Sequence, residues 1–369
     1  MKTVRRLFYA DIVSSVVFVA LAFLSLFFFI DFVDELGGVG TRGYSAVSAA
    51  VYSLVLIPGH LYELLPIAVL IGTIYSLARM AQSTEYTILR TGGLGPGRAL
   101  SLLAALGLLF GALTFIVGDY LAPLAEAQAA RWQAARGSLN LGRTGAWLKD
   151  HSVTPDGERS YSINVGGVAA DGVLRDVRIF EFDSDARLLR RIAAEEARLQ
   201  GNAPWLLSGV NVTRWQTASA GPSVQVNDLK LAQMQWPSTL TAGVVAAAVL
   251  PLSTMSTLDL FRYIDHLAQN EQAAQQYQIQ FWKRALYPFA CLVMMALALP
   301  FAYLHARAGS VSLKVFGGIM LGISFVLLNN VAGHLGLLRE WTPWIVASTP
   351  SALYLLLSLA AFGWLVRFR

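Results

Sequence analysis

The chain has 369 residues, of which 55% are hydrophobic and 14% are charged, with a formal net charge of +5. Soluble domains usually carry about 25% charged residues. This composition and a mean hydropathy of +0.53 therefore exclude an ordinary soluble protein of two or three domains and indicate a membrane protein. The single cysteine, Cys291, excludes an internal disulfide framework and is too little to form a zinc site alone.

Six stretches predict membrane-spanning helices, which need roughly 20 apolar residues each. The first resembles a secretory signal, but it is too long and has no clear cleavage site, so we expect it to be retained. In the second, "PGHLYELLP" interrupts the apolar run, and because proline breaks or kinks a helix, we expect a short helix over residues 45–57 and a crossing over residues 61–78. The other predicted crossings are residues 12–30, 99–118, 285–304, 315–338 and 341–366.

The basic residues near the span ends set the expected orientation, because cytoplasmic loops carry an excess of Lys and Arg. With both termini in the cytoplasm, that side receives ten of them, whereas the short outer loops carry Arg42 and Arg339 beside acidic residues. This bias accounts for much of the positive charge, and no soluble basic patch predicts a nucleic-acid partner. The ten are Lys2, Arg5, Arg6, Arg79, Arg90, Arg98, Arg307, Lys314, Arg367 and Arg369.

An insert separates the third and fourth predicted spans, and the orientation places it outside the cytoplasm. Its alanine-rich start predicts that the third helix continues past the membrane, with Arg131 and Arg136 either on a solvated face or in a binding role. Residues 138–236 then alternate in short runs typical of strands, such as "SYSINVGG" and "LRDVRIFEFD". We include the ambiguous "LLRRIAAEEARL" among them. We expect an antiparallel sandwich or roll, which either holds an apolar ligand or serves as a structural cap.

Residues 237–280 are expected to connect this β region to the last three spans, residues 281–369. The apolar "TLTAGVVAAAVLPLS" is too short to cross a membrane. The segment after it predicts an amphipathic surface helix, with Leu258, Phe261, Ile264 and Leu267 at helical spacing.

Nothing in the sequence supports an enzyme. "GGLGPGRAL" lacks the strand and the lysine of a phosphate loop, and "HLYE" favours a polar pair at the membrane interface over a metal site. Five of the six spans have no acidic residue in their interior, which argues for an apolar cargo or an external source of energy. The charged stretch "LARMAQSTEYTILRTGGLGPGRAL" is either a solvated cytoplasmic turn or a docking helix for a partner that supplies this energy.

Several motifs resemble the LptF/LptG permeases of the lipopolysaccharide transporter, an ATP-binding-cassette machine of the Gram-negative inner membrane. They are "DFVDEL", "LLPIAVLIGTIYSLARMAQSTEYTILRTGG", "GDYLAP", "GAWLKD" and "PWLLSGVNVTRW", and the resemblance covers essentially the whole chain. "FVDEL" and "GAWLKD" are more similar to the LptG members than to the LptF members.

The resemblance implies a six-span permease subunit with an inserted periplasmic β-jellyroll, which extracts lipopolysaccharide from the outer leaflet. Residues 1–137 would contain the first three spans and a coupling helix at about residues 84–90, which docks on the LptB ATPase dimer. Its contact residues would be Glu85, Tyr86, Leu89 and Arg90. The other implied partners are LptF, LptC and the periplasmic LptA bridge; ATP and magnesium would bind to LptB, and no cofactor to this chain.

The resemblance also implies a basic rim and an apolar wall for the lipid. Arg131 and Arg136 would meet lipid phosphates, and Arg42 would substitute for lysines that the family carries where this chain has Asp31 and "GGVG". The wall would include residues of the first and fifth spans, namely Phe27, Phe316, Ile319 and Ile323. The competing interpretation is a membrane-anchored assembly factor that uses its β domain as an interaction module.

Overall fold

The computed structural model describes residues 2–40, 44–83, 91, 95–135, 145–154, 157–169, 173–199, 204–217, 224–238, 240, 244–245, 248, 252–269, 273–303 and 311–367. The chain forms two compact units. The helical unit comprises Met1–Ala125 and Gln275–Arg369, and the β unit comprises Glu126–Ala274.

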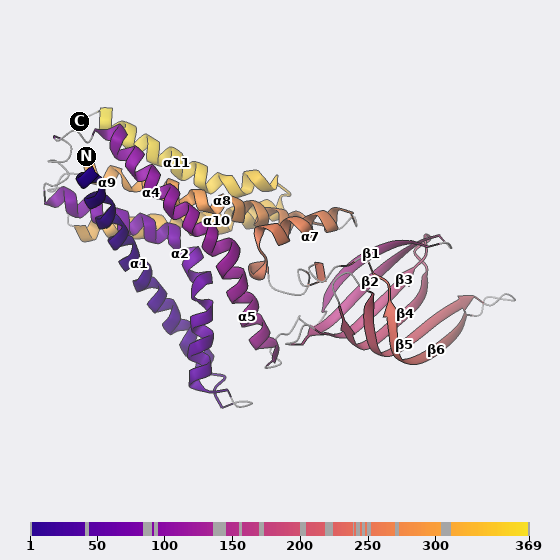
Figure 1. Ribbon diagram of the computed structural model, residues 1–369. Coiled ribbons are helices and arrows are strands. Elements are labelled where there is room, and N and C mark those ends of the chain that lie inside the picture. The colour runs from indigo at the N-terminus through magenta and orange to yellow at the C-terminus, as the bar shows by residue number, and fades with distance from the viewer. Residues whose placement is uncertain are drawn as a thin grey trace. The chain divides into compact units, whose positions relative to one another are not determined.

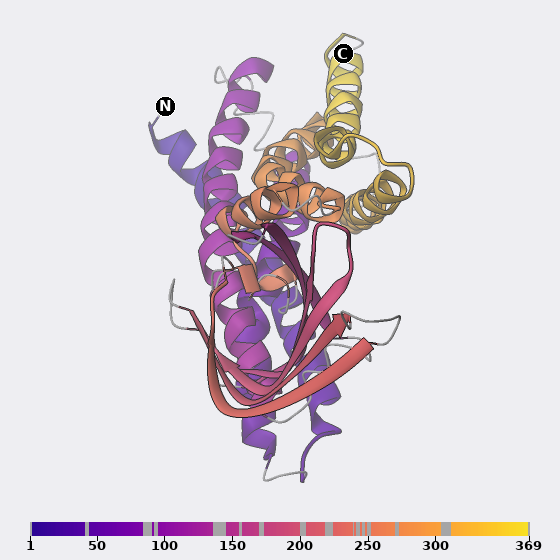
Figure 2. The same ribbon diagram turned by 90° about the vertical axis from the view of Figure 1, so that its right-hand side faces the viewer.

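Six helices in the described residues are long and apolar enough to cross a membrane, as predicted. The chain order is α1 (Lys2–Leu36), α2 (Ala46–Gln82), α4 (Pro96–Ile116), α8 (Gln275–Ala298), α10 (Val311–Leu338) and α11 (Pro343–Arg367), with a short α9 (Pro300–Tyr303) after α8. Through a π-helical turn, η1 (Val117–Leu121), α4 continues into α5 (Ala122–Ala135). The start of α1 and the end of α11 lie at one end of the helical unit (Figures 1 and 2), called here the terminal end; the opposite end is the insert end.

The predicted break in the second span is wrong, because α2 is one helix with Pro58 and Pro66 inside it. Proline removes one backbone hydrogen bond and bends a helix, but within a packed bundle neighbouring groups compensate for the loss. Figure 1 shows α2 changing direction along its length. The sequence therefore marks a bend where we expected a break.

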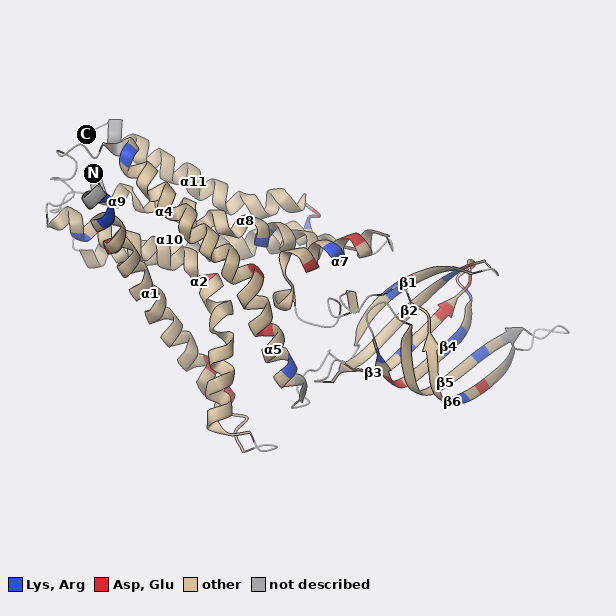
Figure 3. Ribbon diagram, viewed as in Figure 1, with Lys and Arg blue, Asp and Glu red and all other residues tan. Residues whose placement is uncertain are grey.

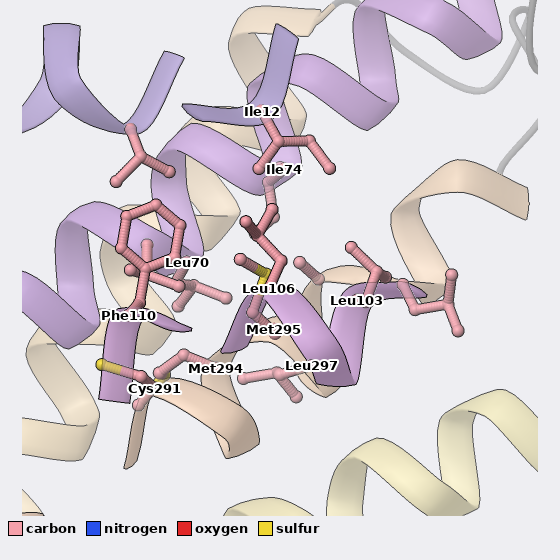
Figure 4. Packing of buried hydrophobic residues seen from close by; sticks show 14 of the residues in the cluster. Ile12, Leu70, Ile74, Leu103, Leu106, Phe110, Cys291, Met294, Met295 and Leu297 are labelled. Atoms are coloured by element: carbon pink, nitrogen blue, oxygen red, sulfur yellow. The ribbon is translucent and has the colours of Figure 1, made fainter. Parts of the chain in front are cut away.

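The core of the helical unit lies between α1, α2, α4 and α8 (Figure 4), where Ile12, Leu70, Ile74, Leu106 and Met295 pack together. Small residues let these helices approach closely. At Gly72, an added Cβ would lie 2.6 Å from the backbone of Val16 in α1. Gly318 and Gly322 of α10 likewise face Ile74 and Ile67 of α2.

The β unit contains a six-stranded antiparallel sheet in which neighbouring strands follow one another in chain order. All the predicted strands are present, including the ambiguous one, which forms β4. There is one sheet, which curls into an open roll (Figure 2), and not a two-sheet sandwich. The strands are β1 (Ala146–Thr154), β2 (Gly157–Val168), β3 (Leu174–Phe182), β4 (Leu188–Arg198), β5 (Trp205–Thr217) and β6 (Val224–Trp236).

The strand register places apolar side chains in rows that form the core of the roll. Ile163, Ile179, Ile192 and Val212 are successive partners on β2 to β5, and all four are buried. Beside them the rings of Trp205 and Trp236 meet edge to face at 5.4 Å. Alternation with polar residues is what a sheet with one buried face requires.

Part of this core comes from the apolar segment that is too short to cross a membrane. Leu240 and Val245 are buried in it, and Val244 and Ala248 pack against it. The indole Nε1 of Trp205 donates a hydrogen bond to the Leu240 carbonyl at 3.4 Å. The chain itself therefore fills part of the space where an apolar ligand was considered.

The predicted amphipathic helix is present as α7 (Thr257–Gln269), preceded by a short 3-10 turn, η2 (Leu252–Thr254). Its buried residues are Leu260, Tyr263 and Leu267. Of the predicted face, Leu267 is buried, whereas Leu258 and Phe261 are exposed. The sequence offers two adjacent apolar stripes, and packing buries the one that begins at Leu260.

Candidate functional site

A pocket of about 410 Å³ opens between α1, α2 and α10. Two of its lining residues are exposed aromatics, Phe18 (73% exposed) and Tyr75 (40% exposed). The pocket shows that the first and fifth spans border one space, with α2 between them. Its lining residues are Asp11, Ser14, Ser15, Phe18, Val19, Ile71, Tyr75, Arg79 and Val315.

One of the polar residues that line the pocket is Asp11, which the sequence analysis missed. Its carboxylate accepts a hydrogen bond from Ser76 Oγ at 2.6 Å and forms an ion pair with Arg79. The only signal in the sequence was an acidic residue just before an apolar run. Its partners lie 65 and 68 residues away, and sequence spacing does not bring them together.

Beyond the pocket, α10 presents an apolar stripe. Phe316 and Ile323 are 58% and 48% exposed, as a wall for an apolar ligand requires, and Ile319 between them is half-buried. Met320 and Leu327 extend the stripe and were not predicted. Leu321, on another side of α10, packs against the core.

Phe27 lies toward the other end of α1, where its ring stacks on His60 of α2 at 4.9 Å. His60 Nε2 in turn lies 2.7 Å from Asp31 Oδ2. Asp31, which was expected to leave a gap in the basic rim, therefore has a histidine partner within the chain. The polar partner of His60 is therefore Asp31 and not Glu63, the other polar residue of "HLYE". Among the described residues, no group of three or more His, Cys, Asp or Glu side chains could hold a metal ion.

Near the insert end, "GDYLAP" coincides with the π-helical turn η1, and π turns often mark functional positions. Gly118 has no side chain, which leaves room for the ring of Tyr62. The Tyr62 ring also faces Arg284 at 5.8 Å, and Tyr287 donates a hydrogen bond to the Glu63 carbonyl at 2.6 Å. Arg284 is buried and the two tyrosines are partly buried in this cluster, which the sequence analysis missed.

Only some of the predicted contact residues lie in the described part of the chain. Arg131 is exposed on α5, which continues the third span as predicted. Arg42, Arg136 and the predicted coupling segment, residues 84–90, lie outside the described residues. Their roles therefore stay predictions.

These features define a class: a multi-pass membrane protein in which a β unit interrupts the helices and α1, α2 and α10 share an exposed apolar face. Within that class, the chain belongs to the family described as lipopolysaccharide export system permease LptF/LptG, which it matches over residues 6–364. It is 29% identical over 342 residues to the lipopolysaccharide export system permease protein LptG of Escherichia coli strain K12, with 91% of each chain covered. It is 26% identical over 333 residues to the LptG protein of Haemophilus influenzae, with 89% of each covered.

Proposed function

We propose that this chain is the LptG-like half of a permease that extracts lipopolysaccharide from the outer leaflet of the inner membrane and passes it toward a periplasmic bridge. The observation that carries the proposal is the shared face of α1, α2 and α10 in a member of this family. Its exposed large side chains, Phe18, Phe316 and Ile323, suit the acyl chains of a lipid. An LptF subunit would provide the opposite wall.

The proposed orientation puts both termini in the cytoplasm and the β unit in the periplasm. The basic residues at the terminal end (Figure 3) support it, because the cytoplasmic side of a membrane protein is enriched in Lys and Arg. An even number of crossings returns the chain to the side where it began. The β unit would then hand the lipid to LptA, and LptC would contact the first span.

Energy would come from a dimer of LptB, which binds ATP and magnesium, while this chain binds no cofactor and catalyses no reaction. The proposed coupling helix follows directly after α2, which ends at Gln82. One turn earlier, Arg79 is paired with Asp11 of α1. Movement of the docked ATPase would thus reach both α1 and α2, the helices that border the pocket.

Mutation of Glu85 tests this function against the assembly-factor alternative. A carboxylate on a docking helix pairs with basic groups of its partner, so Glu85→Lys places like charges face to face. We expect the wild-type chain to purify with an ATPase whose activity depends on it, and Glu85→Lys to lose the ATPase or its coupling. Glu158→Lys, on β2, is the control and should retain both. ATPase recruitment and lipid export that are both normal in Glu85→Lys would contradict the docking assignment.

A further inference from the structure

The amphipathic helix α7 has an apolar surface that stays exposed after folding. Leu258 and Phe261 are 54% and 58% exposed, and Ile264, further along the helix, is half-buried. Residues three positions apart are neighbours on a helix surface, so these side chains form one stripe, called here the exposed stripe. It lies beside the buried residues Leu260 and Leu267. The helix therefore has two apolar surfaces, of which one is buried.

Polar contacts within the chain hold both ends of α7. At its start, Ser256 Oγ accepts a hydrogen bond from the backbone N–H of Asp259 at 3.1 Å, and Asp259 Oδ2 accepts one from the backbone N–H of Ser256 at 3.2 Å. This reciprocal pair is a capping box, which fixes where a helix begins. Near the other end, His266 interacts with Asp150 and with the backbone of Lys149 on β1. The exposed stripe thus belongs to a helix that is fixed within the β unit.

The start of α8 marks the membrane surface at the insert end. Gln275 Nε2 donates hydrogen bonds to the carbonyl of Gly336 near the end of α10, at 3.2 Å, and to that of Trp341 in the following turn, at 3.4 Å. Trp341 and Trp344 are both exposed, and tryptophan is enriched at membrane–water interfaces. The first residue of α8 therefore lies at the level of this interface.

The connection from α7 to this surface is short. The helix ends at Gln269, α8 begins at Gln275, and a chain of this length reaches at most about 20 Å. A helix near the interface with one exposed apolar stripe and one polar face is typical of helices that lie in the membrane surface. Beside the stripe, Arg262 and Asp265 are exposed and opposite in charge (Figure 3). Attraction to anionic lipid is therefore not what would bring α7 to the membrane.

We propose that Leu258, Phe261 and Ile264 insert into the leaflet at the insert end, which is the outer leaflet in the proposed orientation. The acyl chains of phospholipids cover the exposed stripe, and Arg262 and Gln269 face the headgroups and water. This contact anchors the last helix of the β unit in the membrane surface. A partner subunit that covers the same stripe is the rival occupant. The inference concerns phospholipid and does not depend on the cargo.

The test uses the chain assembled with its partner subunits in nanodiscs of phosphatidylcholine without lipopolysaccharide. A photoreactive residue is placed at Phe261 or, as the control, at the exposed Arg262, which points about 100° away around the helix. Phe261 should crosslink to phosphatidylcholine, and Arg262 should do so several times less. Addition of phosphatidylglycerol should leave the labelling unchanged, because α7 carries both signs of charge.

Hydrogen exchange in the same nanodiscs provides a second readout. Phe261→Gln removes an apolar side chain from the exposed stripe and leaves the buried face of α7 intact. The amides of α7 should then exchange faster than in the wild-type chain, because the helix is no longer held by the lipid. Arg262→Gln, at the neighbouring exposed position, should leave the exchange unchanged.

Several results would overturn the proposal. They are crosslinks from Phe261 to a partner subunit in place of lipid, equal or absent lipid labelling at the two positions, and equal exchange in Phe261→Gln and the wild-type chain. A steep rise in labelling with phosphatidylglycerol would show that headgroup charge attracts the helix, and would also overturn it. Because no lipopolysaccharide is present, each of these results leaves the proposed function standing.

Discussion

At the residue scale, polar side chains near both ends of the apolar face hold α1 against α2. Asp11 holds Ser76 and Arg79 at one end of α1, and Asp31 holds His60 toward the other. Each carboxylate thus has a partner on α2. These pairs orient α1 on α2, so that Phe18 and Phe27 keep fixed positions along the face.

Asp11→Asn should separate stability from coupling. The Arg79 side chain is 54% exposed, so loss of the ion pair should lower stability by about 1 kcal/mol or less. We expect the complex to assemble and hydrolyse ATP, but to release less lipopolysaccharide per ATP, because the end of α1 nearest the proposed coupling segment is held less firmly to α2. The two rates are measured on the same proteoliposomes. An unchanged ratio would show that the pair plays no part in coupling.

In the β unit, the surroundings of His266 predict that the stability of the fold depends on pH. Burial lowers the pKa of His266, although Asp150, the backbone of Lys149 and Asp265 act in the opposite direction. A lowered pKa means that folding favours the neutral ring, so stability is complete above the ordinary histidine pKa near 6.5. As the pH falls below that value, the unfolded chain binds the proton more readily and stability is lost.

Hydrogen exchange measures this effect locally in the full chain. After correction for intrinsic rates, the amides of α7 and β1 should exchange faster at pH 5.5 than at pH 7.5. His266→Gln should remove the difference, whereas His151→Gln, at an exposed position on β1, should retain it. Identical protection at the two pH values in the wild-type chain would refute this role of His266.

At the element scale, α1 and α2 act as one pair. Polar contacts join them at both ends, and Gly72 lets them touch backbone to backbone at Val16 between these ends. The bend in α2 belongs to this arrangement, since one helix reaches from His60 to Arg79. A change that separates the pair should therefore affect the whole face.

Substitution of Gly72 tests the close approach. Gly72→Ala forces α1 and α2 apart, and overpacking of this kind costs about 1–3 kcal/mol. Gly317→Ala on α10 is the matched control, because nothing lies within 4 Å of its added Cβ, and alanine favours a helix by up to about 1 kcal/mol. Thermal unfolding in detergent should show a lower melting temperature for Gly72→Ala only. Equal melting temperatures for both variants would contradict the packing.

At the scale of the whole molecule, the sequence predicts the elements well and their contacts poorly. Hydropathy identifies six spans and alternation identifies the strands, because both are local properties of the chain. Closure of the sheet into one roll and continuity of α2 depend on neighbours that no local pattern describes. The same holds for the site: the family resemblance points to Phe316 and Ile323 and their spacing puts them on one helix face, whereas the ion pair of Asp11 with Arg79 depends on how α1 packs on α2.

Photo-crosslinking tests the central claim, that the α1, α2 and α10 face carries lipopolysaccharide. A photoreactive residue is placed at Ile323, which is 48% exposed on this face, or at Leu356 of α11, which is 66% exposed elsewhere. In membranes that contain the partner subunits, Ile323 should crosslink to lipopolysaccharide and lose that crosslink when ATP is added. A probe at Leu356 should not crosslink to lipopolysaccharide, either without ATP or with it. Equal labelling at both positions, or none at Ile323, would contradict the assignment of this face.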